Sequence, residues 1–128
     1  MAPKTRPLSP HLGVYRLPFT AWLSIAHRAT GVLVFAGVVL FSWIMVLLGF
    51  FPDFSVRLLE SPLVHYFLRF VLVGWSGTMC YHYCNGVRHL FWDCGIGFSK
   101  SAATWSGCVM LGAAGLACLV LLVLWLLG

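Results

Sequence analysis

Charged residues are scarce in this sequence. Asp, Glu, Lys and Arg make up 9% of its 128 residues, whereas soluble domains contain roughly 25%. Only three of these residues are acidic, no glycine-rich dinucleotide loop is present, and the five cysteines lack the spacing of a zinc or iron–sulfur site. The chain therefore cannot oxidise a soluble substrate by itself, and any hydride or flavin chemistry must belong to partners. We expect the cysteines to be structural thiols, because most of them lie inside apolar segments.

Apolar residues, by contrast, make up 61% of the chain and form three long runs, over residues 29–52, 63–87 and 101–128. Each run exceeds the roughly 20 helical residues that cross about 30 Å of hydrocarbon. The pattern predicts an all-α membrane protein with transmembrane helices over about 21–50, 62–92 and 103–127. Too little polar chain remains for a separate soluble domain, so we expect residues 1–128 to form a single membrane-anchor domain in the lipid bilayer.

The segments outside these runs contain residues that end helices. Four prolines within residues 1–19 predict an extended N-terminal arm, because proline lacks an amide donor and disfavours helix in the residue before it. Pro52 ends the first helix, and residues 52–62 are expected to form a short interfacial turn or helix. Two glycines within residues 94–98 end the second helix.

The positive charges are distributed asymmetrically about the apolar runs. Two acids and one arginine give the connection between the first two runs a net charge of −1. The cations flanking the opposite ends are Lys4, Arg6, Arg16, Arg28, Arg88 and Lys100. The positive-inside rule therefore places the N-terminus on the cytoplasmic or matrix side. This topology accounts for the basic residues and leaves no basic face for nucleic acid, so we expect no nucleic-acid partner.

Residues 81–93 close the second run and carry most of its polar groups. On a helix, His82, Gly86, His89 and Asp93 fall within one narrow arc, and Gly74 and Thr78 extend that arc backwards. A b-type haem needs a neutral imidazole, a flat slot and cations for its propionates. His82 is the candidate iron ligand, Gly74, Thr78 and Gly86 the candidate slot, and His27, Arg28, Arg88 and His89 the candidate partners of the propionates. Alternatively, His82 is hydrogen-bonded to a carbonyl of a neighbouring helix, and the residues alone favour neither interpretation.

A second axial ligand is hard to find within this chain. His65 lies 17 residues before His82, or about 25 Å along a helix, which is too far to share one iron. His27 is possible but lies nearer the interface. The second ligand is therefore expected from another chain, which predicts an obligate partner. Arg69, one turn after His65, is expected to extend to the outer membrane surface rather than to act in the site.

The first helix opens with Ser24, His27, Arg28 and Gly31, whose spacing predicts one shared face. A quinone headgroup needs a hydroxyl donor, a cation near its developing negative charge and an apolar groove. Ser24, Arg28 and the adjoining Ile25 meet these needs. The alternative is a serine bonded to its own helix and an arginine paired with a lipid phosphate, and these residues alone favour that alternative.

The third helix carries no residues for cofactor chemistry. Small or slender residues recur along it at helical spacing, which predicts a seam for close packing against a neighbouring helix. The predicted seam consists of Ala102, Ser106, Met110, Ala113 and Ala117.

Two stretches together resemble a known family. Residues 6–15 (RPLSPHLGVY) and 24–31 (SIAHRATG) resemble the opening of the cytochrome b subunit of succinate dehydrogenase, the large membrane anchor of complex II. Residues 82–93 (HYCNGVRHLFWD) are similar to that family's HxxNGxRHLxWD segment. The similarity covers the arm and the first two helices, whereas the third helix agrees only in length.

The resemblance implies a role for each matching residue. His82 would be an axial ligand of haem b, with the opposite ligand from a second small membrane-anchor subunit. His27, Arg28 and His89 would lie around the propionates, and Ser24, Ile25 and Arg28 would line a ubiquinone site. Electrons from succinate would arrive through a flavoprotein subunit and an iron–sulfur subunit, at a mitochondrial inner membrane or a bacterial cytoplasmic membrane.

Three other functions compete with this one. The same architecture serves as the anchor of a quinol:fumarate reductase, and the direction of electron flow is not written in the sequence. A purely structural anchor would bind no cofactor. A small transporter or channel would need polar residues through the whole membrane thickness, whereas here they cluster in the predicted cytoplasmic half.

Overall fold

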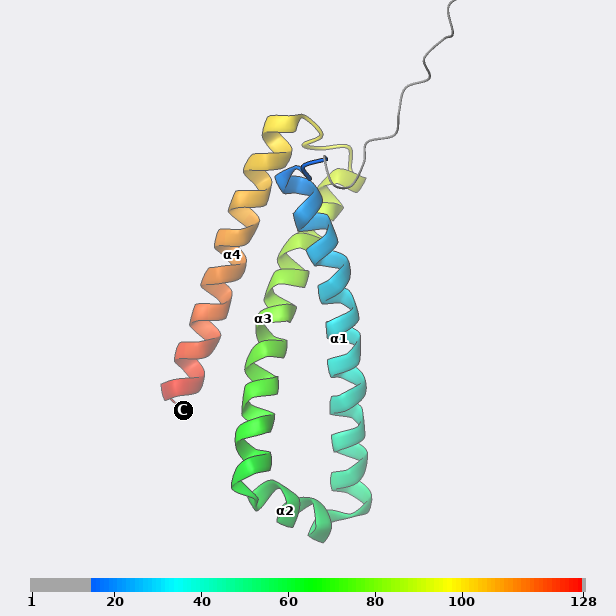
Figure 1. The fold of residues 1–128 in the computed structure, drawn as a ribbon, viewed down its shortest axis with the longest axis vertical. Helices are drawn as coiled ribbons and strands as arrows, with labels where there is room; N and C mark the ends of the chain where they lie inside the picture. Colours follow the sequence, from blue (N-terminus) through cyan, green and yellow to red (C-terminus); the bar gives the residue numbers. More distant parts are fainter. Residues whose placement is uncertain (1–14, 128) are drawn as a thin grey trace, which may run out of the picture.

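A computed structural model describes residues 15–127 of the protein. Within that range the chain forms four helices and no strand, namely α1 (Phe19–Phe50), α2 (Pro52–Glu60), α3 (Pro62–Asp93) and α4 (Lys100–Leu127) (Figure 1). Helices α1, α3 and α4 are long and apolar enough to cross a membrane, which confirms the expected three spans. Residues 15–18 precede α1 without regular structure, and the rest of the expected N-terminal arm lies outside the described residues.

Local sequence signals explain where these helices begin. Pro52 and Pro62 occupy the first positions of α2 and α3, where the missing amide proton is not needed. Helix α4 begins at Lys100 rather than near residue 103, because the Ser99 hydroxyl accepts a hydrogen bond from the Ala102 amide at 3.2 Å and caps the first turn. Helix α1 begins at Phe19, directly after Pro18, two residues before the expected start.

The two connections have different structures. The connection between α1 and α3 is the nine-residue helix α2, and its Ser55 hydroxyl donates to the carbonyl of Leu47 in α1 at 2.9 Å. The connection between α3 and α4 is a turn that contains Gly95 and Gly97, with φ angles of 79° and 86°. Glycine adopts this left-handed region without the steric cost that other residues incur. The expected break after α3 is therefore present.

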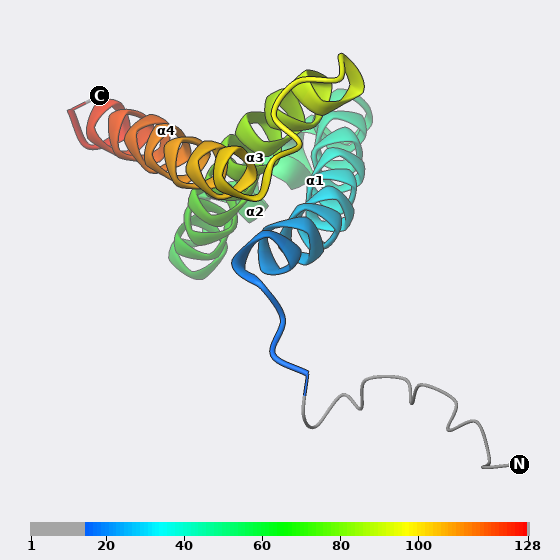
Figure 2. The ribbon, with the colours of Figure 1, turned by 90° about the horizontal axis from the view of Figure 1, so that it is seen from above.

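Helix α3 lies between α1 and α4 and packs against both (Figure 2). Towards its C-terminus α4 leans away from the other two helices (Figures 1 and 2). The start of α1, the end of α3 and the start of α4 meet at one end of the bundle. That end therefore collects the residues that the sequence singles out on α1 and α3.

The packing of α1 on α3 depends on a close approach at Gly37. The Trp75 indole of α3 donates a hydrogen bond to the Val34 carbonyl of α1 at 3.3 Å. Its ring lies directly against Gly37, in space that a β-carbon at that position would occupy. Small residues at such contacts let helices approach closely in a membrane, where dispersion and hydrogen bonds replace the hydrophobic effect.

Burial in this molecule is the reverse of burial in a soluble protein. Among the described residues, the buried apolar side chains are only Leu23, Met110 and Ala114, whereas Ser55, Asn85 and Arg88 are buried polar ones. Large apolar side chains are exposed along all three long helices. A surface of this kind suits a hydrocarbon solvent, in which buried polar groups hold the helices together.

The face that α4 buries overlaps the predicted seam. Met110 is buried, and the half-buried Ser106 accepts a hydrogen bond from Arg88 of α3. Ala113 of the predicted seam is exposed, whereas Ala114 beside it is buried. The packed face is therefore close to the predicted one and turned slightly around the helix.

Candidate functional site

Three histidine rings form a cluster between α1 and α3. His27 of α1 and His82 of α3 stack face to face, with centroids 4.2 Å apart and an interplanar angle of 8°. His89, two turns after His82, tilts against His27 at 4.8 Å, and Trp92 meets the His89 ring edge-on at 5.0 Å. Within residues 15–127, no His, Cys, Asp or Glu side chains converge in the manner of a metal-ion centre.

The hydrogen bonds of His82 assign its two ring nitrogens. Nδ1 lies 3.2 Å from the His27 carbonyl oxygen and 3.3 Å from the Thr30 hydroxyl. A carbonyl only accepts, and the Thr30 hydroxyl already donates to the Ala26 carbonyl at 2.8 Å. In the neutral imidazole Nδ1 therefore carries the proton and Nε2 the lone pair. Histidines that bind metals are held in this way by a backbone carbonyl on the other nitrogen.

This bond is compatible with both interpretations of His82. The imidazole is hydrogen-bonded to a carbonyl of a neighbouring helix, as the alternative interpretation expects. The bond uses Nδ1 alone and orients the ring, so it is compatible with coordination through Nε2.

Two glycines let the histidine rings approach the facing helix. A β-carbon at Gly31 would lie 3.1 Å from His82 Cε1, and one at Gly86 would lie 3.9 Å from His27 Cε1. The predicted slot of Gly74, Thr78 and Gly86 is divided: Gly86 faces α1, whereas a β-carbon at Gly74 would meet no atom within 4 Å. The imidazoles themselves therefore occupy the space at Gly31 and Gly86, while Gly74 lies on an open side of α3.

Two nitrogens of the cluster lack partners. His27 Nδ1 and His89 Nε2 are buried and form no hydrogen bond with the described residues. Buried polar atoms are normally paired, because leaving one unpaired costs about 1–3 kcal/mol. The described residues therefore supply no partner for these two nitrogens.

The candidate quinone residues lie in the first turns of α1. Ser24 is half-buried, Ile25 is 44% exposed and Arg28 is exposed. The hydroxyls of Ser42 and Ser76 donate to carbonyls four residues earlier, but that of Ser24 bonds to no described residue. The predicted bond of Ser24 to its own helix is therefore wrong, and the hydroxyl is available to a ligand.

The four residues predicted to share one face of α1 are divided. His27 and Gly31 lie against the rings and backbone of α3, whereas Arg28 is exposed. Adjacent positions on a helix are about 100° apart, so the face of α1 that packs on α3 includes position 27 and leaves position 28 outside the contact. The histidines and the Ser24 region are consequently neighbouring but distinct parts of the site.

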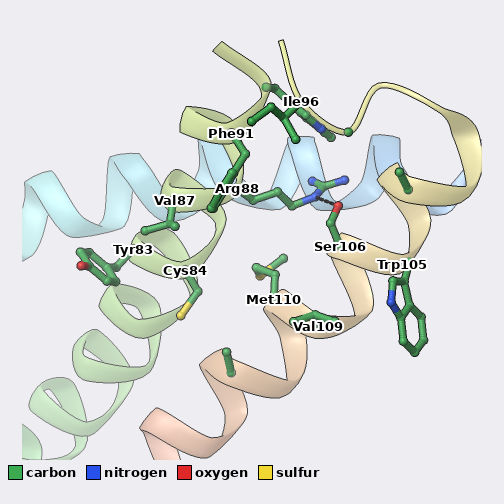
Figure 3. A pocket seen from close by; sticks show the side chains of 14 residues that line it. Tyr83, Cys84, Val87, Arg88, Phe91, Ile96, Trp105, Ser106, Val109 and Met110 are labelled. Carbon is green, nitrogen blue, oxygen red and sulfur yellow. Dashed lines mark hydrogen bonds between the residues drawn. The ribbon is translucent and has the colours of Figure 1, made fainter. Parts of the chain in front are cut away.

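Arg88 has a different role from the one predicted. It is 5% exposed, and its Nε and Nη2 donate to the Ser106 hydroxyl at 3.0 Å and the Ala103 carbonyl at 2.8 Å, both on α4. Figure 3 shows the side chain extending from α3 towards Ser106. Trp92 packs on the guanidinium at 4.0 Å. The expectation that Arg88 pairs with haem propionates is therefore wrong for this conformation.

Sequence reasoning missed Asn85 and Tyr81. Asn85 is fully buried, and its amide donates to the Leu23 carbonyl at 3.3 Å while its Oδ1 accepts from Arg88 Nη1 at 3.3 Å. The Tyr81 hydroxyl donates to the same carbonyl at 2.9 Å. An asparagine three residues before an arginine in an apolar helix was the available signal, because such a spacing puts both on one face.

A groove of about 610 Å³ lies between α3 and α4 beside Arg88 (Figure 3). Its lining is almost entirely apolar and includes Val87, Phe91 and Met110. Neither Ser24 nor Arg28 lines it. The polar groups at its edge, Arg88 and Ser106, are already bonded to each other.

Fold and site together define a class of protein. It is a small integral membrane protein with three spans, in which imidazoles of α1 and α3 meet near one end of the bundle. Comparison with known proteins agrees. Residues 2–127 match the model of the succinate dehydrogenase/fumarate reductase transmembrane subunit family. The chain therefore belongs to this family.

Relatives are found in bacteria and in an animal. The chain is 42% identical over 106 residues to the succinate dehydrogenase cytochrome b556 subunit of Rickettsia prowazekii, covering 82% of each chain. It is 40% identical over 120 residues to the cytochrome b556 subunit of Paracoccus denitrificans, covering 92% of this chain and 91% of that one. Against the mitochondrial cytochrome b560 subunit of Sus scrofa it is 39% identical over 110 residues, or 83% of this chain and 63% of the relative.

Proposed function

We propose that this chain anchors succinate dehydrogenase (complex II) in the membrane, ligates haem b through His82 and forms part of a ubiquinone-reduction site. Membership of the family and the names of the relatives support the anchor role. Succinate would be oxidised in a flavoprotein subunit, and electrons would reach the membrane through an iron–sulfur subunit. The family model covers fumarate reductases as well, but the relatives compared here are succinate dehydrogenase subunits, which favours succinate oxidation.

The observation that carries the haem assignment is the hydrogen bond between His82 Nδ1 and the His27 carbonyl at 3.2 Å. It fixes the tautomer whose Nε2 is able to bind iron. His27 and His89 have buried nitrogens without protein partners beside that ring, and these suit the propionates. When bound, haem b supplies a reversible one-electron carrier.

The second axial ligand is assigned to the partner anchor subunit. The His27 ring already touches the His82 ring face to face at 4.2 Å, so no iron fits between them. His65 is exposed near the opposite end of α3. Neither histidine is therefore suited to the position opposite His82.

The quinone site is assigned to the first turns of α1. The Ser24 hydroxyl is free to donate to a quinone carbonyl, and the exposed Arg28 side chain offers a positive charge as that oxygen becomes negative. Ile25 presents an apolar surface beside them. All three side chains leave part of their surface uncovered, which suits a site completed by the iron–sulfur subunit and the second anchor.

Replacing His82 tests the haem assignment. In the intact purified complex, His82→Ala should remove the b-type band from the reduced-minus-oxidised spectrum, because Nε2 is lost. His65→Ala is the matched control: it removes an exposed histidine near the other end of α3 and should leave the band unchanged. A full b-type band in an assembled His82→Ala complex would show that the ligand lies elsewhere.

A further inference from the structure

A set of buried hydrogen bonds joins the three spans one turn away from the histidine cluster. We call it the brace; it consists of Leu23 on α1, Tyr81, Asn85 and Arg88 on α3, and Ala103 and Ser106 on α4. Its centre is the Leu23 carbonyl, which accepts from both the Tyr81 hydroxyl and the Asn85 amide. One backbone oxygen of α1 is thus held by two side chains of α3.

Among the described residues, the positive charge of Arg88 is stabilised by neutral partners and not by a carboxylate. Arg88 donates to a hydroxyl, an amide oxygen and a backbone carbonyl, and its guanidinium packs on the Trp92 ring. Asn85 connects the arginine to Leu23, and it has no exposed surface. Because Asn85 is fully covered, water does not reach it to replace a broken bond, so each of its partners must keep its position.

The position of the brace gives it an effect on the site. Leu23 precedes Ser24 directly and precedes His27 by one turn, while Asn85 follows His82 by three residues. The bonds at Leu23 and the His27–His82 stack therefore connect successive turns of the same two helices. Sliding α1 by one residue along α3 would shift it by about 1.5 Å and break both bonds at Leu23.

We propose that Asn85 and Arg88 are positioning residues, which fix the register of α1 on α3 through the Leu23 carbonyl and so hold His27, His82 and Ser24 in their working geometry. Arg88 orients the Asn85 side chain by donating to Oδ1, which turns the amide nitrogen towards Leu23. Ser106 and Ala103 orient Arg88 in turn. This inference rests on the proposed function, because the haem and quinone assignments define the working geometry.

Asn85→Asp separates the two bonds of Asn85. The two side chains have nearly the same shape, and the carboxylate would bind Arg88 more strongly than the amide oxygen does. It has no proton for the Leu23 carbonyl, however, and would repel that oxygen. If Asn85 served only to hold Arg88, the variant would behave like the native chain.

The measurements use the intact purified complex. For Asn85→Asp we expect a shifted haem midpoint potential or b-type band, and a KM for ubiquinone raised about fivefold, the equivalent of one lost hydrogen bond. Succinate oxidation by an artificial dye should be unchanged, because it bypasses the membrane site. Arg69→Lys is the control: Arg69 is an exposed cation near the other end of α3, and all three measurements should stay at native values.

Tyr81→Phe provides a milder test if the Asn85→Asp complex does not assemble, since it removes only the hydroxyl at Leu23. It should change the same measurements in the same direction. The inference would be overturned if an assembled Asn85→Asp complex had the native spectrum, midpoint potential and KM. The same result in Tyr81→Phe would overturn it if only that variant assembles. Failure of the proposed function is distinguishable, because His82→Ala would then also retain its haem.

Discussion

The two nitrogens of the His82 ring serve separate purposes. Nδ1 holds the ring through the His27 carbonyl, and Nε2 keeps the lone pair. Gly31 permits this orientation, since a β-carbon there would lie 3.1 Å from the ring. The helix that carries the predicted propionate partner His27 thus also sets the tautomer of the predicted iron ligand.

Ser24 is the residue whose replacement separates quinone chemistry from succinate oxidation. Ser24→Ala removes a hydroxyl that bonds to no other described residue, so the fold should be unaffected and about one hydrogen bond to the quinone should be lost. We expect ubiquinone reduction to fall about tenfold, with an upper limit near a hundredfold. Dye-linked succinate oxidation should persist.

Ser42→Ala provides the matched control for Ser24→Ala. Its hydroxyl donates to the Val38 carbonyl of its own helix, and it lies more than four turns further along α1. Both activities should stay at native levels in this variant. Equal loss of quinone and dye activity in Ser24→Ala would contradict the quinone assignment, because it would indicate damage to the whole complex.

Side chains of unusual chemistry were predictable from sequence, and networks between helices were not. His82 stood out because an imidazole within an apolar run needs a partner. Arg88 also stood out, but its partners Ser106 and Ala103 belong to α4, and the predicted seam on α4 did not say which side chain of the neighbouring helix would meet Ser106. Tyr81 and Asn85 share an acceptor on α1 that is a backbone oxygen, which has no signature in the sequence.

At the scale of elements, the length and hydropathy of the apolar runs predict the membrane-spanning helices well, because a bilayer requires a minimum length and an apolar surface of each span. The bounds of α1 and α3 lie within two residues of those expected. The start of α4 differs more, since Ser99 caps a turn before the apolar run begins. The packing face of α4 was predicted only approximately: Met110 and Ser106 of the predicted seam meet α3, but Ala113 is exposed, because alanines and glycines on several sides of the helix permit close approach.

Gly37 is the element-scale test of how α1 packs on α3. Gly37→Ala places a methyl group where the Trp75 indole lies, and this rigid ring is also held by its bond to the Val34 carbonyl. We expect the purified complex to lose about 1–3 kcal/mol of stability, as overpacked sites do. Thermal denaturation followed by the loss of quinone reductase activity measures the effect.

Gly49→Ala on the same helix is the control for Gly37→Ala. A β-carbon at Gly49 would meet no atom within 4 Å, so only helix propensity changes, and alanine is favoured there by about 1 kcal/mol. If the Gly37→Ala and Gly49→Ala complexes were both as stable as the native complex, Trp75 would not pack on Gly37 in the membrane.

At the scale of the whole molecule, polar contacts concentrate at one end. The histidine cluster and the brace lie where α1 begins and α3 ends, whereas the outer half of α4 leans away (Figure 1). The apolar side chains of that half are exposed. The Arg69 guanidinium, near the start of α3, lies 5.3 Å from the centre of the Trp125 ring near the end of α4. The exposed apolar surfaces suit contact with lipid and with the proposed second anchor subunit. The residues that this second subunit would add to the site could not be predicted from the sequence of one chain.

The orientation of the molecule follows from its charges and makes a final prediction. The ends of the spans near Arg16, Arg28 and Lys100 should face the cytoplasm or matrix, and α2, with its net charge of −1, should face the opposite side. Val56→Cys introduces a thiol at an exposed position of α2 without changing its charge. A membrane-impermeant maleimide should label it from outside intact bacterial cells that assemble the complex. The native Cys94, exposed in the turn after α3, should react only in inside-out vesicles. Labelling of Cys94 in intact cells, with Val56→Cys protected, would show that the bundle is inserted the other way round.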